Sequence, residues 1–189
     1  ITAAGMNDIY VSKLDGSGNF VWAKSMGSAG NDWGYALDLD ASGNVFTTGG
    51  FQSTGDFDPG VGTYSLTFGG VFISKLDNSG NFVWAAKLAS NGSYGQAISV
   101  DAAGSVYTAG GHVGGDFDPG AGTVNLNSIG FSDVFISQLD ANGNYLWAGT
   151  AGDFGTDNAF GINVNNNAIH VTGYYNGAGD FDPTAGTYS

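Results

Sequence analysis

Paired carboxylates are the residues of this sequence whose types and spacing best suit chemistry. The tetrapeptide Asp-Phe-Asp-Pro occurs at residues 56–59, 116–119 and 180–183, and it contains every proline of the chain. Two carboxylates separated by one residue in an extended segment can bind a hard cation such as calcium, together with nearby backbone carbonyls. The candidate calcium ligands are Asp56, Asp58, Asp116, Asp118, Asp180 and Asp182.

A purely structural role explains the same tetrapeptide equally well. In the first copy Phe57 would anchor a loop in the core, while Asp56 would accept hydrogen bonds from nearby backbone amides. The proline favours an extended conformation at Asp58. Calcium gains support from carboxylates in the links expected at the same end of the sheet, namely Asp32, Asp153 and Asp157, although the second link carries Ser93 there. Both interpretations remain open.

The composition argues against most other chemistry. The chain has no cysteine, glutamate or arginine, so it lacks a cysteine nucleophile, a thiolate metal site and an arginine clamp for phosphate. Its net charge of −13 disfavours nucleic acid and anionic lipid as partners, and it contains no run of about 18 apolar residues that would insert into a membrane. Aspartate pairs could hydrolyse glycosides, but these pairs recur in every repeat, whereas an enzyme normally assembles one site. We therefore expect a non-enzymatic protein.

The carboxylate motif recurs because the whole chain repeats itself. LDGSGNFVWA, LDNSGNFVWA and LDANGNYLWA place Trp22, Trp84 and Trp147 at the same position of a unit of roughly 62 residues. The units are approximately 1–62, 63–125 and 126–189, within a single repeat region that covers 1–189. A repeat of this length indicates a repeat architecture. The two histidines, His112 and His170, fall at different positions of their units, which argues against a repeated histidine site.

Each unit is predicted to form four β-strands. In the first full passage the strands are residues 35–40, 45–50, 71–76 and 82–87, where β-branched and aromatic residues lie between Gly, Asn, Asp and Ser turns. The turns at 40–44 and 77–81 predict tight hairpins, whereas about twenty residues with the Asp-Phe-Asp-Pro motif separate the second and third strands. Four-stranded antiparallel meanders repeated in tandem predict an all-β fold made of β-propeller blades.

Aromatic residues divide into two groups in this prediction. The three repeated tryptophans fall on the fourth, outer strand, where a large ring can pack between adjacent blades. Trp33 and Tyr94 instead fall near the loop end of the first strand, where exposed aromatics can bind the faces of sugars. These two residues are our candidate ligand-binding residues, for carbohydrate.

The repeat resembles a known family. The pattern DxFxSKLDxxGNxxWA, followed by a Gly-rich link and GxALDLDASGNVFTTG, is similar to the SBBP-type bacterial β-propeller repeat over essentially all of the chain, and the Asp-Phe-Asp-Pro loop resembles a subgroup of that family. The resemblance implies a secreted or cell-surface protein. The third unit departs from the pattern, because Gln138 stands where Lys13 and Lys75 stand in the others. Our first interpretation is an extracellular scaffold or adhesion module, with calcium as a candidate stabilising ion. The alternative is a carbohydrate-binding propeller.

The ends of the chain are out of phase with the blades. The sequence begins with the third and fourth strands of one blade, at 9–14 and 20–25, and ends after the first two strands of another, at 161–174. Unpaired terminal strands need partners. We therefore expect self-association or further blades of the same chain, in a ring or a fibre, and the sequence is expected to be a processed chain or a piece of a longer one.

Overall fold

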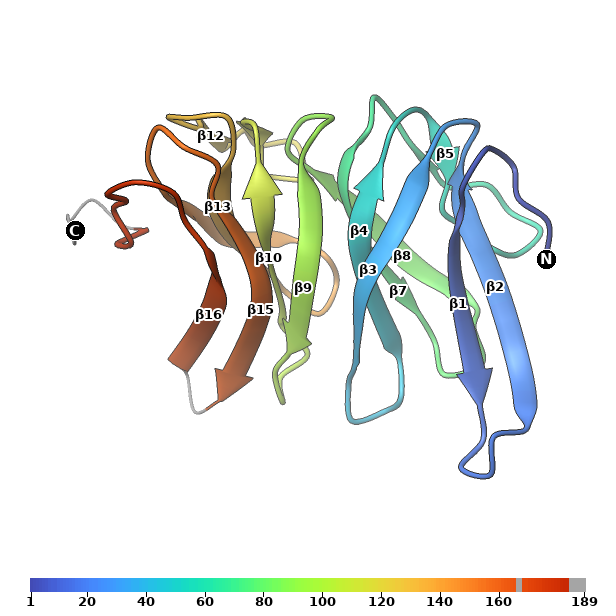
Figure 1. Ribbon diagram of the computed structural model, residues 1–189. Helices are drawn as coiled ribbons and strands as arrows, with labels where there is room; N and C mark the ends of the chain where they lie inside the picture. The colour runs from blue at the N-terminus through green and yellow to red at the C-terminus, as the bar shows by residue number, and fades with distance from the viewer. Residues whose placement is uncertain (166–167, 184–189) are drawn as a thin grey trace.

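The computed structural model describes residues 1–165 and 168–183, and it consists of β-strands in antiparallel sheets (Figure 1). Two four-stranded meander sheets stand side by side, with a hairpin beyond each of them, and the N-terminal hairpin forms a third four-stranded sheet with the short hairpin of an insertion. This arrangement is β-propeller-like and confirms the all-β prediction. Within the described ranges, no helix is long and apolar enough to cross a membrane.

The strands follow the predicted meander. The N-terminal hairpin contains β1 (Ile9–Leu14) and β2 (Phe20–Ser28). The first sheet contains β3 (Asp32–Leu39), β4 (Val45–Phe51), β7 (Gly70–Leu76) and β8 (Phe82–Leu88). The second sheet contains β9 (Tyr94–Val100), β10 (Val106–His112), β13 (Asp133–Leu139) and β14 (Tyr145–Ala151). The C-terminal hairpin contains β15 (Asn158–Asn165) and β16 (Ala168–Tyr174).

The predicted long loops contain short hairpins of their own. The first insertion carries β5 (Gly55–Asp56) and β6 (Ser65–Leu66), and the second carries β11 (Gly115–Asp116) and β12 (Asn125–Leu126). As expected, the insertions lie at one end of the sheets and the tight hairpins at the other (Figure 1).

Each insertion pairs with the outer strand of the preceding sheet, which the sequence did not reveal. β5 extends β2 through the pairs Gly27↔Asp56 and Ser28↔Gly55. After β8, the amide of Ala89 donates to the carbonyl of Asp116 at 2.7 Å. After β14, the amide of Gly152 donates to the carbonyl of Asp180 at 3.0 Å. The insertion therefore links every unit to its predecessor through the backbone.

The hydrophobic cores lie between the sheets. One core joins the first and second sheets and contains Phe46, Ile73, Ile98 and Leu139 among its buried residues. A second joins the N-terminal hairpin to the first sheet, and a smaller third joins the second sheet to the C-terminal hairpin. A strand such as β7 is buried along nearly its whole length. Its sequence is therefore mostly apolar, without the alternation of polar and apolar residues that marks a strand with one exposed face.

Aspartates close the tight hairpins. In the turn after β13, Asp140 Oδ1 accepts hydrogen bonds from the amides of Asn142 and Asn144 at 2.8 and 2.9 Å, and the side chain of Asn144 donates to Oδ2. These bonds, led by the Asn144 side chain, hold the pKa of Asp140 below its ordinary value. The same bonds recur at Asp15, Asp40 and Asp77. The repeated acidic turns are therefore local structural devices.

Tryptophan and lysine connect neighbouring units through one carbonyl. Trp22 Nε1 and Lys13 Nζ both donate to the carbonyl of Asn78 in the next unit, at 3.3 and 3.0 Å. The next pair, Trp84 and Lys75, donates in the same way to the carbonyl of Ala141, at 3.1 and 3.3 Å. This confirms the predicted packing between units for Trp22 and Trp84.

We expect Trp84→Phe to lower the free energy of unfolding by about 1 kcal/mol, because the ring stays packed against the core while the hydrogen bond to the carbonyl of Ala141 is lost. Trp147→Phe is the matched control, since no third and fourth strands follow it within the described residues to supply such a carbonyl. Urea unfolding of both variants measures the difference. Equal losses in the two would contradict the assigned role.

Candidate functional site

The first Asp-Phe-Asp-Pro segment is folded around its own carboxylates. Asp56 Oδ1 accepts hydrogen bonds from the amides of Asp58 at 3.0 Å and Tyr64 at 2.9 Å. Asp58 Oδ1 accepts one from the amide of Gly60 at 2.7 Å. A Cβ atom on Gly60 or Gly62 would lie 2.9 or 2.3 Å from the Asp58 carboxylate, so a larger residue at either position would have to displace that carboxylate. The backbone thus wraps closely around Asp58.

The other copies repeat this geometry. Asp116 Oδ1 accepts from the amides of Asp118 and Val124 at 3.0 and 2.8 Å, and Asp118 Oδ1 accepts from Gly120 at 2.7 Å. In the third copy, the amide of Asp182 donates to Asp180 Oδ1 at 3.0 Å. Each pair thus makes the amide-capping contacts expected of a structural turn. Across residues 1–165 and 168–183 there is no group of three or more His, Cys, Asp or Glu residues that could hold a metal ion.

The link aspartates stabilise the exit from the second strand of each unit. Buried Asp32 accepts a hydrogen bond from the amide of Gln52 at 3.2 Å, and Asp157 accepts one from the amide of Asn176 at 2.8 Å. In the unit between them Ser93 occupies the equivalent position, and its Oγ accepts a hydrogen bond from the amide of Val113 at 3.1 Å. Serine can therefore replace aspartate here because the contact requires only an acceptor oxygen.

The phenylalanine of the first two motifs reaches the core, whereas Phe181 of the third is 45% exposed. Phe57 is fully buried, and its ring centroid lies 5.2 Å from those of Phe51 and Phe72. The second unit repeats this aromatic triad, with centroids 5.4 Å apart for His112 and Phe117 and 5.2 Å apart for Phe117 and Phe135. The buried triad fixes the insertion to the sheet, as the structural interpretation predicts.

His112 is held as a neutral imidazole. The amide of Gly114 donates to Nδ1 at 3.1 Å, so the proton lies on Nε2, which is 2.8 Å from Thr150 Oγ1. The hydroxyl of Thr150 donates in turn to the carbonyl of Val134 at 3.1 Å. Burial lowers the pKa of His112 from 6.5 to about 4. A second proton would have to sit on Nδ1, facing the Gly114 N–H group.

Trp33 and Tyr94 lie together at the junction of the first and second sheets. Their ring centroids are 5.9 Å apart in an edge-to-face arrangement, and Tyr35 lies 6.1 Å from Tyr94. Tyr94 also covers Gly50 so closely that a Cβ there would lie 2.4 Å from the ring. We call Trp33, Tyr35 and Tyr94 the aromatic cluster. Part of it therefore packs between the sheets, while Tyr35 stays about half exposed.

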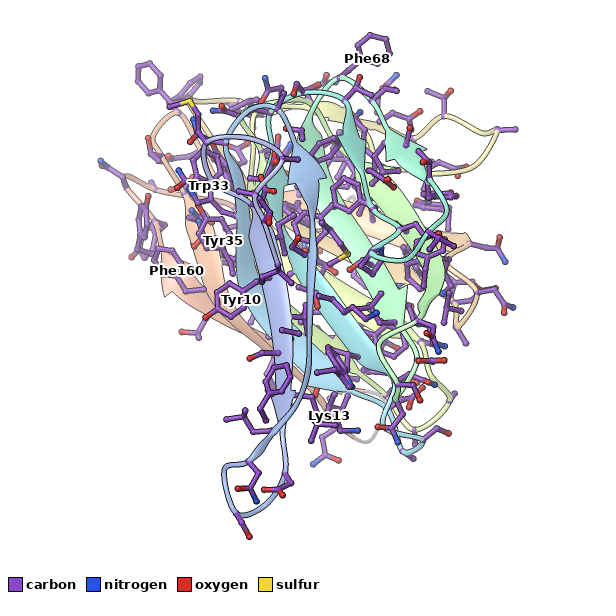
Figure 2. The ribbon with its side chains drawn as sticks, turned by 90° about the vertical axis from the view of Figure 1, so that its right-hand side faces the viewer. Tyr10, Lys13, Trp33, Tyr35, Phe68 and Phe160 are labelled. Atoms are coloured by element: carbon purple, nitrogen blue, oxygen red, sulfur yellow. The ribbon has the colours of Figure 1, made fainter. Side chains whose placement is uncertain are left out.

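Sequence reasoning missed Tyr35 and its counterpart Phe160 as surface aromatics. Each lies at a break in strand register, between Gly34 and Ala36 and between Ala159 and Gly161, where a bulge turns the extra side chain outward. Figure 2 shows Tyr35, Phe160 and Trp33 on the same side of the molecule, along with Tyr10. A signal was present, because each unit carries two small residues flanking one larger residue at this point.

Comparison with known proteins gives limited information. No model of a protein family matches the chain. The chain is 27% identical over 207 residues to an uncharacterized WD repeat-containing protein of Acanthamoeba polyphaga mimivirus, and the match covers 93% of this chain but 14% of that protein. The chain is thus similar to a small part of a WD repeat-containing protein, which agrees with its repeated four-stranded antiparallel sheets.

We expect His112 to make the protein less stable in mild acid. Because its folded pKa lies below its unfolded pKa, its contribution is complete above pH 6.5 and is lost as the pH falls toward 4, by up to about 3 kcal/mol. Chemical denaturation at several pH values measures this loss. His112→Phe introduces the residue found at the equivalent position 51, and it should remove the dependence of stability on pH between pH 6.5 and 4. Identical pH profiles for the two proteins would contradict the assignment.

Proposed function

We propose that this protein is a non-enzymatic β-propeller scaffold of the SBBP type, displayed outside the cell as an adhesion or interaction module. The observation that carries the proposal is the repeated use of its polar groups to join one unit to the next. The tryptophan and lysine of one unit donate to a turn of the following one, and each insertion returns to the preceding outer strand. The likeness to a WD repeat-containing protein also supports a scaffold that binds protein partners.

A carbohydrate-binding role is the second candidate function. The aromatic cluster supports it, because Trp33, Tyr35 and Tyr94 combine ring faces and a partly exposed surface at one junction. Sugars stack on such surfaces, and nearby aspartates could accept hydrogen bonds from their hydroxyl groups. In the following unit Asn158 stands at the position of Trp33 and Tyr94, so the aromatic pair is not repeated, which favours the scaffold over a lectin with repeated sites.

Two measurements test the proposed function. Protease treatment of intact cells of the source organism should remove the protein if it is displayed on the surface, and its full protection would refute that location. A glycan array should show no reproducible binding by the wild type. Binding that is lost in Trp33→Ala, but kept in Phe68→Ala at an exposed loop, would establish the carbohydrate function instead.

We also propose that calcium stabilises the Asp-Phe-Asp-Pro insertions. Asp56 and Asp58 use Oδ1 to accept amide hydrogen bonds, and a cation could engage further oxygens of the same segment. Ordering a loop of this length is costly, which a bound ion would offset.

If calcium binds, removing it with a chelator should lower the melting temperature of the wild type by several degrees, since about 1 kcal/mol shifts the melting temperature by roughly 2–4 °C in a chain of this size. Asp56→Asn with Asp58→Asn should reduce that shift. Asp15→Asn, in a tight hairpin turn, is the matched control and should keep it. A chelator that leaves the wild type unchanged would refute calcium binding.

A further inference from the structure

One large apolar residue is exposed at the same position of every unit. Met6, Phe68 and Phe131 each lie two residues before the position of Gly70, at which the third strand of the first sheet begins. They are 76%, 83% and 82% exposed. We call these three residues the apolar row. Methionine and phenylalanine are usually buried, so their exposure at equivalent positions indicates an interaction surface.

The exposure of Phe68 and Phe131 does not arise from the ends of the chain. They precede β7 and β13, the third strands of the two complete sheets, and each of these sheets has described strands on both sides (Figure 1). Figure 2 shows Phe68 projecting beyond the ribbon at the end that carries the insertions, which we call the insertion end. Further units would be added next to the terminal hairpins and would leave this end open.

A backbone hydrogen bond to the link holds the apolar row in the first and third units. The amide of Met6 donates to the carbonyl of Gly30 at 3.0 Å, and the amide of Phe131 donates to the carbonyl of Gly155 at 2.9 Å. Phe154, the neighbour of Gly155 in the same link, is also 82% exposed. Two adjoining loops of the third unit therefore each expose a phenyl ring.

Phe68 reaches the same exposure in a strained conformation. Three residues lie between Leu66 and Gly70, whereas six lie between Leu126 and Asp133 in the next unit. In this shorter loop Phe68 has a φ of +67°. A bulky residue is rare in this left-handed region, which glycine adopts without strain. An outlier of this kind points to a function of the side chain itself.

The insertion end is also strongly acidic. Of the 17 acidic residues of the chain, the three insertions carry six and the links carry three, and Asp8 and Asp133 lie next to the apolar row. The pKa of Asp133 reflects this crowding: burial raises it, and the charges of Asp157 and Asp153 raise it further. Negative charge is therefore concentrated behind the exposed apolar side chains.

Lysine does little to offset this negative charge. Lys13 and Lys75 donate to carbonyls of tight hairpins at the opposite end, and a Cβ on Gly80, in such a hairpin, would lie 3.0 Å from Cε of Lys24.

The fourth and last lysine of the sequence, Lys87, lies near the insertion end, with its Cε 3.2 Å from the place of a Cβ on Gly70. A partner for the insertion end must therefore bring cations as well as an apolar surface.

We propose that the apolar row and the carboxylates behind it bind a cationic amphipathic segment of a protein partner, which presents lysine or arginine beside large apolar residues. This inference deepens the interaction role of the scaffold and rests on that proposed function. Methionine and aromatic residues are enriched where proteins bind each other, and opposite charges steer the encounter and fix its orientation. A second copy of the chain or an anionic lipid surface would bring negative charge to an acidic end.

A synthetic peptide of leucine and lysine that forms an amphipathic helix is the probe for this site. Fluorescence anisotropy of the labelled peptide should show binding to the wild type, and salt should weaken the binding because it screens opposite charges. The same peptide with glutamate in place of lysine should not bind. The peptide with serine in place of leucine should bind at least about tenfold more weakly, because it lacks the apolar face.

Substitutions in the apolar row test the site itself. Phe68→Ser and Phe131→Ser should each weaken binding of the leucine–lysine peptide at least about tenfold. Phe20→Ser is the matched control and should leave the affinity unchanged, because Phe20 is 70% exposed but begins β2 at the end of the tight hairpins.

Phe68→Gly separates binding from folding. Because glycine adopts a φ of +67° without strain, this variant should lose affinity as Phe68→Ser does but keep the melting temperature of the wild type, measured by circular dichroism. A clear fall in the melting temperature would instead assign Phe68 to the stability of the fold.

Two results would overturn the inference. One is the absence of binding to the leucine–lysine peptide, or binding that ignores both Phe68→Ser and Phe131→Ser. The other is binding to neutral phosphatidylcholine vesicles that requires Phe68, which would make a lipid surface the partner.

The proposed surface location fails separately. A protein that protease removes from intact cells but that does not bind the peptide would refute only the docking site. A protein that binds the peptide but stays protected in intact cells would refute only the surface location.

Discussion

The mutual covering of sheet faces by neighbouring sheets is the constraint on which the whole structure depends. A four-stranded sheet of this size has two apolar faces, and each core of the protein draws its side chains from two adjacent units. Burial of apolar surface then occurs only when units stand in series. The polar links reinforce this order, because Trp84 and Lys75 donate to a single carbonyl in the next unit rather than within their own.

The insertions extend the same constraint from side chains to the backbone. Each passes back over the preceding unit, and in the first two insertions a buried phenylalanine anchors the loop in its own sheet. A loop fixed at both points holds its carboxylates in place through their amide contacts. That geometry explains why the tetrapeptide recurs without invoking a metal, and it leaves calcium as an addition to a loop that is already tied down.

The sequence could predict the parts of the fold that depend on local chemistry. The repeat length, the strand positions and the aspartate turns all follow from residues close together in the chain, and the outer-strand tryptophans follow from their recurrence. Pairing of β5 with β2 could not be predicted, because it joins segments about 30 residues apart through backbone groups that any residue carries. The neutral state of His112 follows from its burial in the folded protein, and the partner of its Nε2, Thr150, comes from a different strand.

The sequence identified most residues of the candidate site but not the contacts between them. The motif aspartates were identified, and their role as acceptors for amides was one of the two interpretations, but the tight fit of Gly60 and Gly62 around Asp58 required coordinates. Trp33 and Tyr94 were singled out as exposed aromatics, whereas their contact with each other arises only because equivalent positions of adjacent units meet at the junction of the first and second sheets.

Two residues that differ between the units face each other across the second and third strands: Phe46 faces Lys75, and Tyr107 faces Gln138. Lys75 lies 4.8 Å from the Phe46 ring centre in the first sheet, whereas in the second sheet Gln138 donates to the hydroxyl of Tyr107 at 2.7 Å. Exchanging one partner alone would place a lysine beside a hydroxyl group or a glutamine against a hydrocarbon ring. The second and third strands of each sheet therefore make a polar contact suited to their own residue pair, in addition to the backbone register.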